Sequence, residues 1–338
     1  MTCKMPLMVK ALKKIIKYTV LLSILLLFLA WYFLVGLHGS SSGEEFNRGE
    51  NGLWIKHAWV GNEQDTSVVE DLALKLAKYD IKYVYVHTGP IDSDGTIPEE
   101  RYKFAEEFID ILTAKNPEVV PLAWLGQIRS DIDIDDPEIR SNIVETCAKL
   151  VSETGYAGIH YDIEPVPHDD QGFLDLLQET RDKLGDETFI SIATDEWQPT
   201  LVSDVVGVIL DQTIESYWET EYFQASAEIV DQIVVMTYDT SLGDSEHYEW
   251  LVEQQVIYLS QVLAPYGKEL LIGIPTYEDD KESFDPEVEN METGLNGIIA
   301  GLNNKRTTRD AFTGVAIYAN WETTESEWDI YEKLWQGL

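Results

Sequence analysis

The chain has 338 residues, of which 44% are hydrophobic and 25% charged, so it can bury a sizeable core and is not a disordered polypeptide. Its 61 acidic residues against 24 basic ones give a net charge of −37. A surface of that sign repels phosphate backbones, which excludes nucleic acid as a partner. The two cysteines and six histidines form no cluster with zinc-site spacing, so we expect no metal or other cofactor.

The N-terminal segment is predicted to be a membrane anchor. Residues 1–17 hold five lysines and no acidic residue, and residues 18–37 carry no charge. Twenty residues at helical rise match a hydrocarbon thickness of roughly 30 Å. The lysines place residues 1–17 in the cytoplasm and the remainder outside, as a single-pass protein of the cell membrane. A cleaved signal peptide is the alternative for the same run. Residues 38–50, rich in Gly and Ser at their start, are expected to form a flexible linker.

Residues 51–338 alternate short β-rich runs with amphipathic helical stretches. The expected strands are 53–60, 83–87, 119–125, 158–163, 189–193, 233–238, 270–275 and 314–318. Eight β/α units in about 290 residues predict a (β/α)8 TIM barrel, an α/β fold of one domain. A doubly wound open sheet is the alternative, and it is weaker because no Gly-rich nucleotide loop follows the first strand.

In such a barrel the chemistry takes place where the strands end and the following loops begin. Aromatic and acidic side chains gather at these positions, and they are what a sugar site needs, because flat rings stack on pyranose faces and carboxylates bond hydroxyls. We therefore expect substrate to be bound by Trp124, His160, Trp197, Asp239, Tyr277, Tyr318 and Trp321.

The fourth expected strand, GIHYDIE at residues 158–164, carries the most specific pattern. Alternation along the strand puts His160, Asp162 and Glu164 on one face, toward the barrel interior. A negative Asp162 beside Glu164 in a poorly solvated pocket would raise the pKa of Glu164, as a general acid working near neutrality requires. A buried polar cluster that only fills the interior is the alternative.

These residues resemble glycoside hydrolase family 18, the chitinase-like family. That family's fourth strand reads D-G-x-D-x-D-x-E, and Gly158, Asp162 and Glu164 match it, whereas Ala157 and His160 stand at the first two aspartate positions. The runs MTYD at 236–239 and GIPTY at 273–277 are similar to the family's sixth and seventh strands. The family's aromatic residue at the eighth strand is supplied by Tyr318 or Trp321.

The resemblance implies a glycosidase that cleaves β-linked N-acetylhexosamine glycans of the chitin, peptidoglycan or N-glycan type by substrate-assisted retaining catalysis. It assigns Glu164 as general acid and base, Asp162 as the stabiliser of the oxazolinium-like charge, and Tyr238 as the partner of the acetamido carbonyl. Asp239 would bind a sugar hydroxyl or support Tyr238. His160 could take the place of the missing aspartate by donating a hydrogen bond to Asp162.

Two other functions remain open from the sequence. A carbohydrate-binding barrel without activity would explain the two missing aspartates. A metal-dependent hydrolase could use His57, His87 and His160 with Asp162 around a divalent cation. The sequence does not determine which glycan is bound, whether cleavage is endo or exo, or the oligomeric state.

Overall fold

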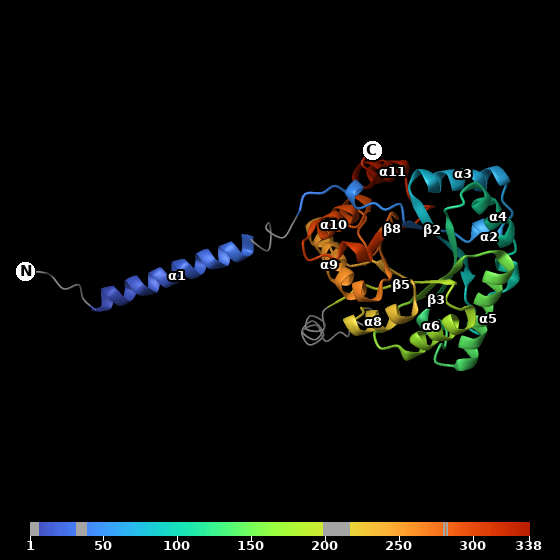
Figure 1. The fold of residues 1–338 in the computed structure, drawn as a ribbon, viewed down its shortest axis with the longest axis horizontal. Coiled ribbons are helices and arrows are strands. Elements are labelled where there is room, and N and C mark those ends of the chain that lie inside the picture. The colour runs from blue at the N-terminus through green and yellow to red at the C-terminus, as the bar shows by residue number, and fades with distance from the viewer. Residues whose placement is uncertain (1–6, 32–38, 199–216, 280, 282) are drawn as a thin grey trace, which may run out of the picture.

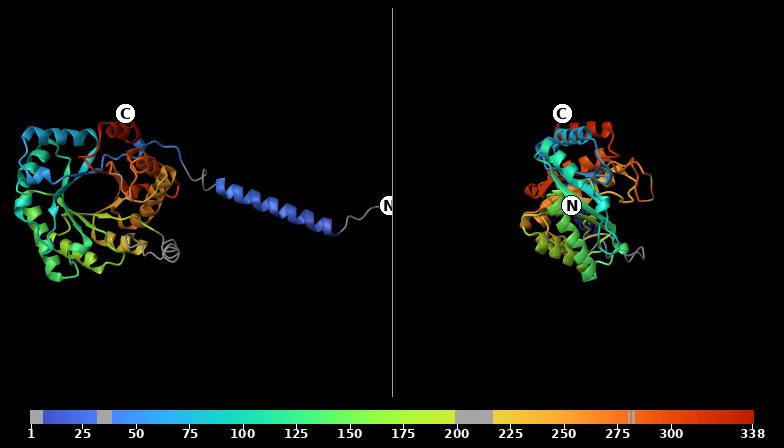
Figure 2. Two further views of the ribbon diagram at one scale, coloured as in Figure 1. Left: turned by 180° about the vertical axis from the view of Figure 1, so that it is seen from behind. Right: turned by 90° about the vertical axis from the view of Figure 1, so that its right-hand side faces the viewer.

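The computed structural model describes residues 7–31, 39–198, 217–279, 281 and 283–338. Eight parallel strands pair in chain order and close into a barrel, which confirms the predicted (β/α)8 fold (Figure 1). Figure 2 shows the same closed ring of strands from behind. The strands are β1 Asn51–Ile55, β2 Ile81–Pro90, β3 Val120–Ile128, β4 Gly158–Glu164, β5 Phe189–Thr194, β6 Gln232–Met236, β7 Glu269–Pro275 and β8 Phe312–Tyr318.

The helices of the barrel surround these strands (Figure 1). They are α2 Ala58–Gly61, α3 Thr66–Lys78, α4 Ala105–Lys115, α5 Pro137–Thr154, α6 Gln171–Leu184, α8 Thr220–Ile229, α9 Ser245–Leu263, α10 Met291–Asn303 and α11 Glu325–Tyr331. Helix α5 illustrates how local sequence sets their ends. Asp136 caps its N-terminus by accepting from the Glu138 amide, Pro137 occupies the first turn, and Gly155 ends it with φ 82°.

The hydrophobic core has two layers, one inside the barrel and one between the strands and the helices. On β4 the apolar residues Ile159, Tyr161 and Ile163 belong to the outer layer. His160 and Asp162 alternate with them and are buried on the inner side, 0% and 8% exposed. The inner layer is unusually aromatic, and it includes Trp54, Tyr83, Tyr85 and Trp124. The strand alternation expected from the sequence is therefore the one that the barrel uses.

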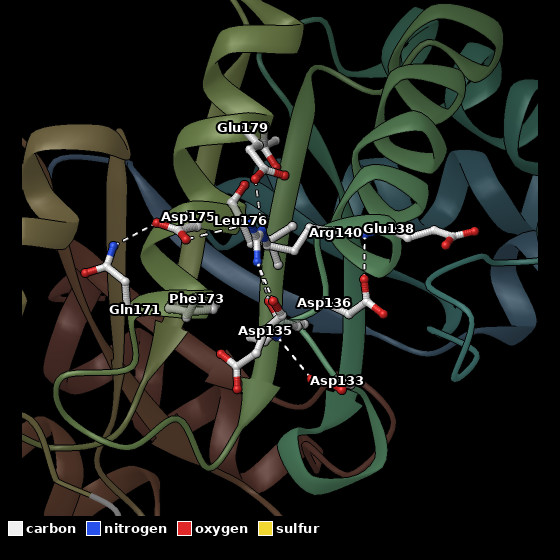
Figure 3. Close-up of polar contacts among 12 residues, drawn as sticks. Asp133, Asp135, Asp136, Glu138, Arg140, Gln171, Phe173, Asp175, Leu176 and Glu179 are labelled. Atoms are coloured by element: carbon white, nitrogen blue, oxygen red, sulfur yellow. Dashed lines mark hydrogen bonds and ion pairs between the residues drawn. The ribbon is translucent and has the colours of Figure 1, made fainter.

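Arginine side chains hold the loop between β3 and α5 in place. Arg140 of α5 is 7% exposed and donates to the carbonyls of Ile134 and Asp135 at 3.0 and 3.1 Å. Its Nε also donates to Glu179 of α6 at 2.9 Å, as Figure 3 shows. Because loops after strands lie at the chemically active end of such barrels, this clamp fixes one side of that end.

The prediction that the chain is a single-pass membrane protein is wrong. Among the residues that the structure describes, no helix is both long and apolar enough to cross a bilayer. Helix α1, Leu7–Trp31, includes four of the five lysines. The rest of the expected span, residues 32–37, lies outside the described residues. This finding contradicts the predicted localisation in the cell membrane and leaves the membrane without support as a partner.

The segment expected as a linker makes contacts with the barrel over its described part. The Ser41 amide donates to Asn303 Oδ1 at 2.7 Å, and Asn303 Nδ2 donates back to the Ser41 carbonyl at 2.7 Å. Asn303 is the last residue of α10, so this pair of hydrogen bonds ties the chain before β1 to the end of that helix.

Candidate active site

A pocket of about 220 Å³ opens at the carboxyl ends of β4, β6, β7 and β8. Five carboxylates and one lysine line it, together with three tyrosines, so it combines negative charge with aromatic surface. Its lining residues are Asp162, Glu164, Met236, Tyr238, Asp239, Tyr277, Asp279, Lys281, Tyr318, Trp321 and Glu322. The rule that places chemistry at this end of a TIM barrel is met by this pocket.

Asp162 and Glu164 form a carboxyl pair at the end of β4. Asp162 Oδ2 accepts a hydrogen bond of 2.7 Å from Trp124 Nε1, while Oδ1 is buried without a donor. Burial raises the pKa of Asp162, and hydrogen bonds with Glu164 and Trp124 oppose that rise. Glu164 ends β4 and is exposed at the pocket mouth. Withdrawal of its carboxyl from bulk water, and then the charge of Asp162, raise its pKa well above the usual range.

Tyrosine rings form the opposite wall. The rings of Tyr238 and Tyr318 stack at a centroid distance of 5.6 Å and an angle of 24°, and Tyr277 meets both edge-on at 6.0 and 5.9 Å. Burial, followed by the neighbouring Tyr318 and the carboxyl pair, raises the pKa of Tyr238 well above its usual value. Its hydroxyl is therefore protonated at neutral pH and available as a donor.

Asp239 lies beside Tyr238 and is tied to the loop after β7. Lys281 forms an ion pair with it at 3.2 Å, and Ser283 Oγ donates to it at 3.1 Å. The Lys281 ammonium also lies 5.1 Å from the centre of the Tyr277 ring. Asp239 has φ 62°, in the left-handed region that aspartate tolerates better than most residues. The sixth and seventh strand ends are thus joined across the pocket rim.

Three further carboxyl groups, in the loops after β5 and β7, have raised pKa values, and one of them, Asp195, lies within the electrostatic reach of the pair. Burial and the charge of Asp162 raise the pKa of Asp195, after β5, to about 7. Burial also raises the pKa of Glu196 to about 8 and that of Glu289 to about 7. Such values near neutrality gather at functional sites, where burial and like charge act together.

A comparison with known protein families identifies the family of this chain. The family model "Glycosyl hydrolases family 18" matches residues 58–335. The chain belongs to this family. It is therefore a glycosidase by family, and the resemblance inferred from the fourth, sixth and seventh strands is confirmed. No curated protein sequence matches the chain.

Solved structures show the same fold at low sequence identity. The spore cortex-lytic enzyme SleL of Bacillus cereus is 13% identical with TM-score 0.57, over 83% of this chain and 73% of that one. A chitinase-like agglutinin from Robinia pseudoacacia is 14% identical with TM-score 0.56, over 84% and 99%. A family 18 chitinase from Cycas revoluta in complex with (GlcNAc)4 is 13% identical with TM-score 0.54, over 85% and 99%. At these identities the likeness concerns the fold alone.

The structure brings together most of the residues singled out on the family motifs. Asp162, Glu164 and Tyr238 all line the pocket. Of the expected substrate-binding residues, those that also line it are Asp239, Tyr277, Tyr318 and Trp321. Tyr318 and Trp321, the two candidates for the family's aromatic residue at the eighth strand, both line the pocket, and their rings meet edge-on at 5.6 Å.

Two of the expected substrate-binding tryptophans do not line this pocket. Trp124 is 7% exposed inside the barrel, where its indole faces Asp162. Trp197 stacks on Tyr258 at 4.4 Å and donates from Nε1 to Thr220 at 3.0 Å, so its ring packs between the strand end and helices α8 and α9. Sequence position placed both near strand ends but could not give the direction of the side chains.

His160 is completely buried and does not bond Asp162. Its Nε2 lies 3.1 Å from Trp54 Nε1 and its Nδ1 lies 2.8 Å from Ser191 Oγ. Burial holds the pKa of His160 well below its usual value, so the ring is neutral. The expected donation from His160 to Asp162 is therefore absent. The expected contact of His160 with substrate is not seen either, because this residue does not line the pocket.

The histidines expected for a metal site do not converge. His57 Nε2 lies 2.6 Å from the Arg101 carbonyl, and the His57 and His87 rings meet edge-on at 5.9 Å, while both nitrogens of His160 are engaged elsewhere. Within the described part of the chain, no three His, Cys, Asp or Glu side chains are grouped to hold a metal ion.

Sequence reasoning missed three residues that line the pocket, Asp279, Lys281 and Glu322. It also missed the role of Trp124, which is a hydrogen-bond donor rather than a stacking ring. The one available signal was the isolated lysine after the seventh strand in a chain with so few basic residues.

Proposed function

We propose that the chain hydrolyses β-linked N-acetylhexosamine glycans by substrate-assisted retaining catalysis. The observation that carries this proposal is the carboxyl pair on β4, in which Asp162 and Glu164 line one pocket together with Tyr238, Tyr277 and Tyr318. Substrate-assisted family members need no protein nucleophile, so an acid, a charge stabiliser and a carbonyl partner are sufficient.

In the first step Glu164 gives its proton to the glycosidic oxygen as the bond from that oxygen to the anomeric carbon breaks. The carbonyl oxygen of the substrate's 2-acetamido group forms a bond to the same carbon and yields an oxazolinium ion. Asp162, as a carboxylate, accepts the acetamido N–H and balances the positive charge. The Tyr238 hydroxyl donates to the acetamido oxygen and holds it on line for attack.

In the second step the ionised Glu164 removes a proton from water, whose oxygen forms a bond to the anomeric carbon. The bond from that carbon to the acetamido oxygen breaks and the acetamido group is restored. Two inversions give net retention, and Glu164 ends the cycle protonated. Asp239, Tyr277, Tyr318 and Trp321 are proposed to bind the sugar units.

The shape of the pocket supports a polymeric substrate. Its volume of about 220 Å³ is below the ~300 Å³ of pockets that enclose a whole drug-sized ligand. A site of this size suits one sugar unit at its deepest point, with neighbouring units along the rim.

The test is hydrolysis of N-acetylglucosamine oligomers by the wild type and by Glu164→Gln. The variant loses the transferable proton but keeps the shape of the side chain, so product release should fall at least 10³-fold while oligomer binding, measured by calorimetry, is retained. Glu228→Gln, an exposed carboxyl on α8, is the matched control and should hydrolyse at the wild-type rate.

Two results would contradict the proposal. Full turnover by Glu164→Gln would remove the acid assignment. Binding of the oligomers by the wild type without any cleavage would instead establish a carbohydrate-binding barrel.

A further inference from the structure

Asp162 receives one hydrogen bond from the barrel wall, and the donor is an indole. Trp124 and Asp162 are 7% and 8% exposed, and their contact is 2.7 Å long. On β3, Gly126 is the residue directly opposite Asp162, and a methyl group added there would lie 3.3 Å from Trp124 Nε1. Because Gly126 has no side chain, the indole of Trp124, two residues earlier on β3, has room to reach the Asp162 carboxylate.

His160 cannot replace this donor. An indole N–H only donates, so the contact from Trp54 Nε1 makes Nε2 of His160 an acceptor. The neutral ring then carries its proton on Nδ1 and donates it to Ser191 Oγ. Ser191 in turn donates to Gln232 at 2.8 Å, so this chain of hydrogen bonds runs away from Asp162.

The same chemistry distinguishes the two carboxyl groups of the pair. The indole N–H of Trp124 is a donor only, so it always bonds an oxygen lone pair of Asp162. A fixed donor of this kind stabilises the ionised form of a carboxyl group more than the neutral form. Among the described residues, none donates a hydrogen bond from the barrel wall to Glu164. Asp162 Oδ1 is buried without a hydrogen-bond partner, so among the described residues Trp124 is the donor that the barrel wall supplies to this carboxyl group.

We propose that Trp124 is a positioning residue that holds Asp162 as the ionised member of the pair and thereby keeps the shared proton on Glu164. The inference rests on the proposed function, since it concerns the same two carboxyl groups.

Other charged and titratable groups also face the pair, and they stay in place when Trp124 is changed. His87, which lies 4.5 Å from the Trp124 ring, is neutral because burial lowers its pKa to about 4. The groups whose charge or ionisation acts on the pair are Asp195 after β5, Tyr238 and Asp239 after β6, and Tyr318 at the end of β8.

The test is the pH profile of Trp124→Phe on N-acetylglucosamine oligomers. Loss of a hydrogen bond to a charged acceptor should lower kcat about 10- to 100-fold and change KM less than about twofold. The acid limb of the profile, which belongs to the pair as a unit, should move up by about one pH unit, because Asp162 becomes harder to ionise. Trp54→Phe is the matched control. It removes a buried indole N–H that bonds His160 instead, and it should leave the acid limb in place.

The outcomes separate this inference from the proposed function. An unmoved acid limb in Trp124→Phe, with Glu164→Gln inactive, overturns the inference and leaves the proposed function standing. An equal shift in Trp54→Phe also overturns it, because the effect would then be general to the barrel interior. Wild-type activity in Glu164→Gln overturns both.

A measurement on the wild type covers the case in which Trp124→Phe does not fold. With ¹⁵N-tryptophan labelling, one indole N–H resonance should titrate with the same midpoint as the acid limb, because its acceptor is the carboxylate that titrates there. If no indole resonance moves across that pH range, the inference is overturned without any variant.

Discussion

Glu289 offers the sharpest prediction on stability. It is fully buried, and its Oε1 accepts from the Thr240 amide at 3.2 Å and from Thr240 Oγ1 at 2.8 Å, which holds the loop after β6 that carries Asp239. Burial raises the pKa of Glu289 from 4.5 to about 7. The folded chain therefore binds this proton more tightly than the unfolded chain does. The stability that this proton provides is complete below about pH 4.5 and is lost as the pH rises through about 7.

The magnitude follows from that shift. At 1.36 kcal/mol per unit, ionisation of Glu289 lowers the free energy of unfolding by at most about 3 kcal/mol at pH 8. Glu289→Gln keeps an oxygen for both Thr240 bonds but cannot ionise. We expect the variant and the wild type to unfold with similar free energies near pH 5, and the variant to be more stable at pH 8, with Tm higher by up to about 6–10 °C.

The assay is calorimetric unfolding of both proteins from pH 5 to pH 8, with Glu228→Gln as a control for loss of an exposed carboxyl. A difference in Tm between wild type and Glu289→Gln that stays constant over this range would refute the reasoning, because only a buried ionising group makes the difference depend on pH.

Two further predictions concern the loop clamp and the tyrosine wall. Arg140→Met leaves two carbonyls and Glu179 without their donor, and it should lower the free energy of unfolding in urea by about 3 kcal/mol, whereas a loss under about 1 kcal/mol would contradict the clamp. Tyr238→Phe should lower kcat about 10²- to 10³-fold with KM almost unchanged in steady-state kinetics, and a change confined to KM would assign Tyr238 to binding alone.

The barrel could be predicted because its strands are buried on both faces. Each expected run is apolar or β-branched and bounded by polar residues, and each falls on one of the eight strands. The first strand was predicted too long, through residue 60. After Lys56 and His57, the apolar residues Ala58, Trp59 and Val60 form part of helix α2, where the Trp59 ring packs on Phe108 at 5.7 Å. Apolar continuity alone cannot distinguish a strand from a short helix.

The sequence could predict those site residues that follow from local patterns, namely side-chain alternation along a strand and short strand motifs. Asp162 and Glu164 follow from their spacing on β4, and Tyr238 follows from the sixth-strand motif. The contact between Trp124 and Asp162 depends on the stagger between β3 and β4, and the burial of Trp197 depends on helices α8 and α9. Such relations join residues that are far apart in the chain, so no local pattern contains them.

The central claim is that the substrate's own acetamido group is the nucleophile. The most direct measurement compares wild-type hydrolysis of two oligosaccharides that differ only in carrying a 2-acetamido or a 2-hydroxyl group, with the first product's anomeric configuration followed by NMR. The account predicts cleavage of the acetamido substrate with retention and no detectable cleavage of the other. Equal rates on both, or an inverted product, would show that a protein carboxylate or a water molecule attacks instead.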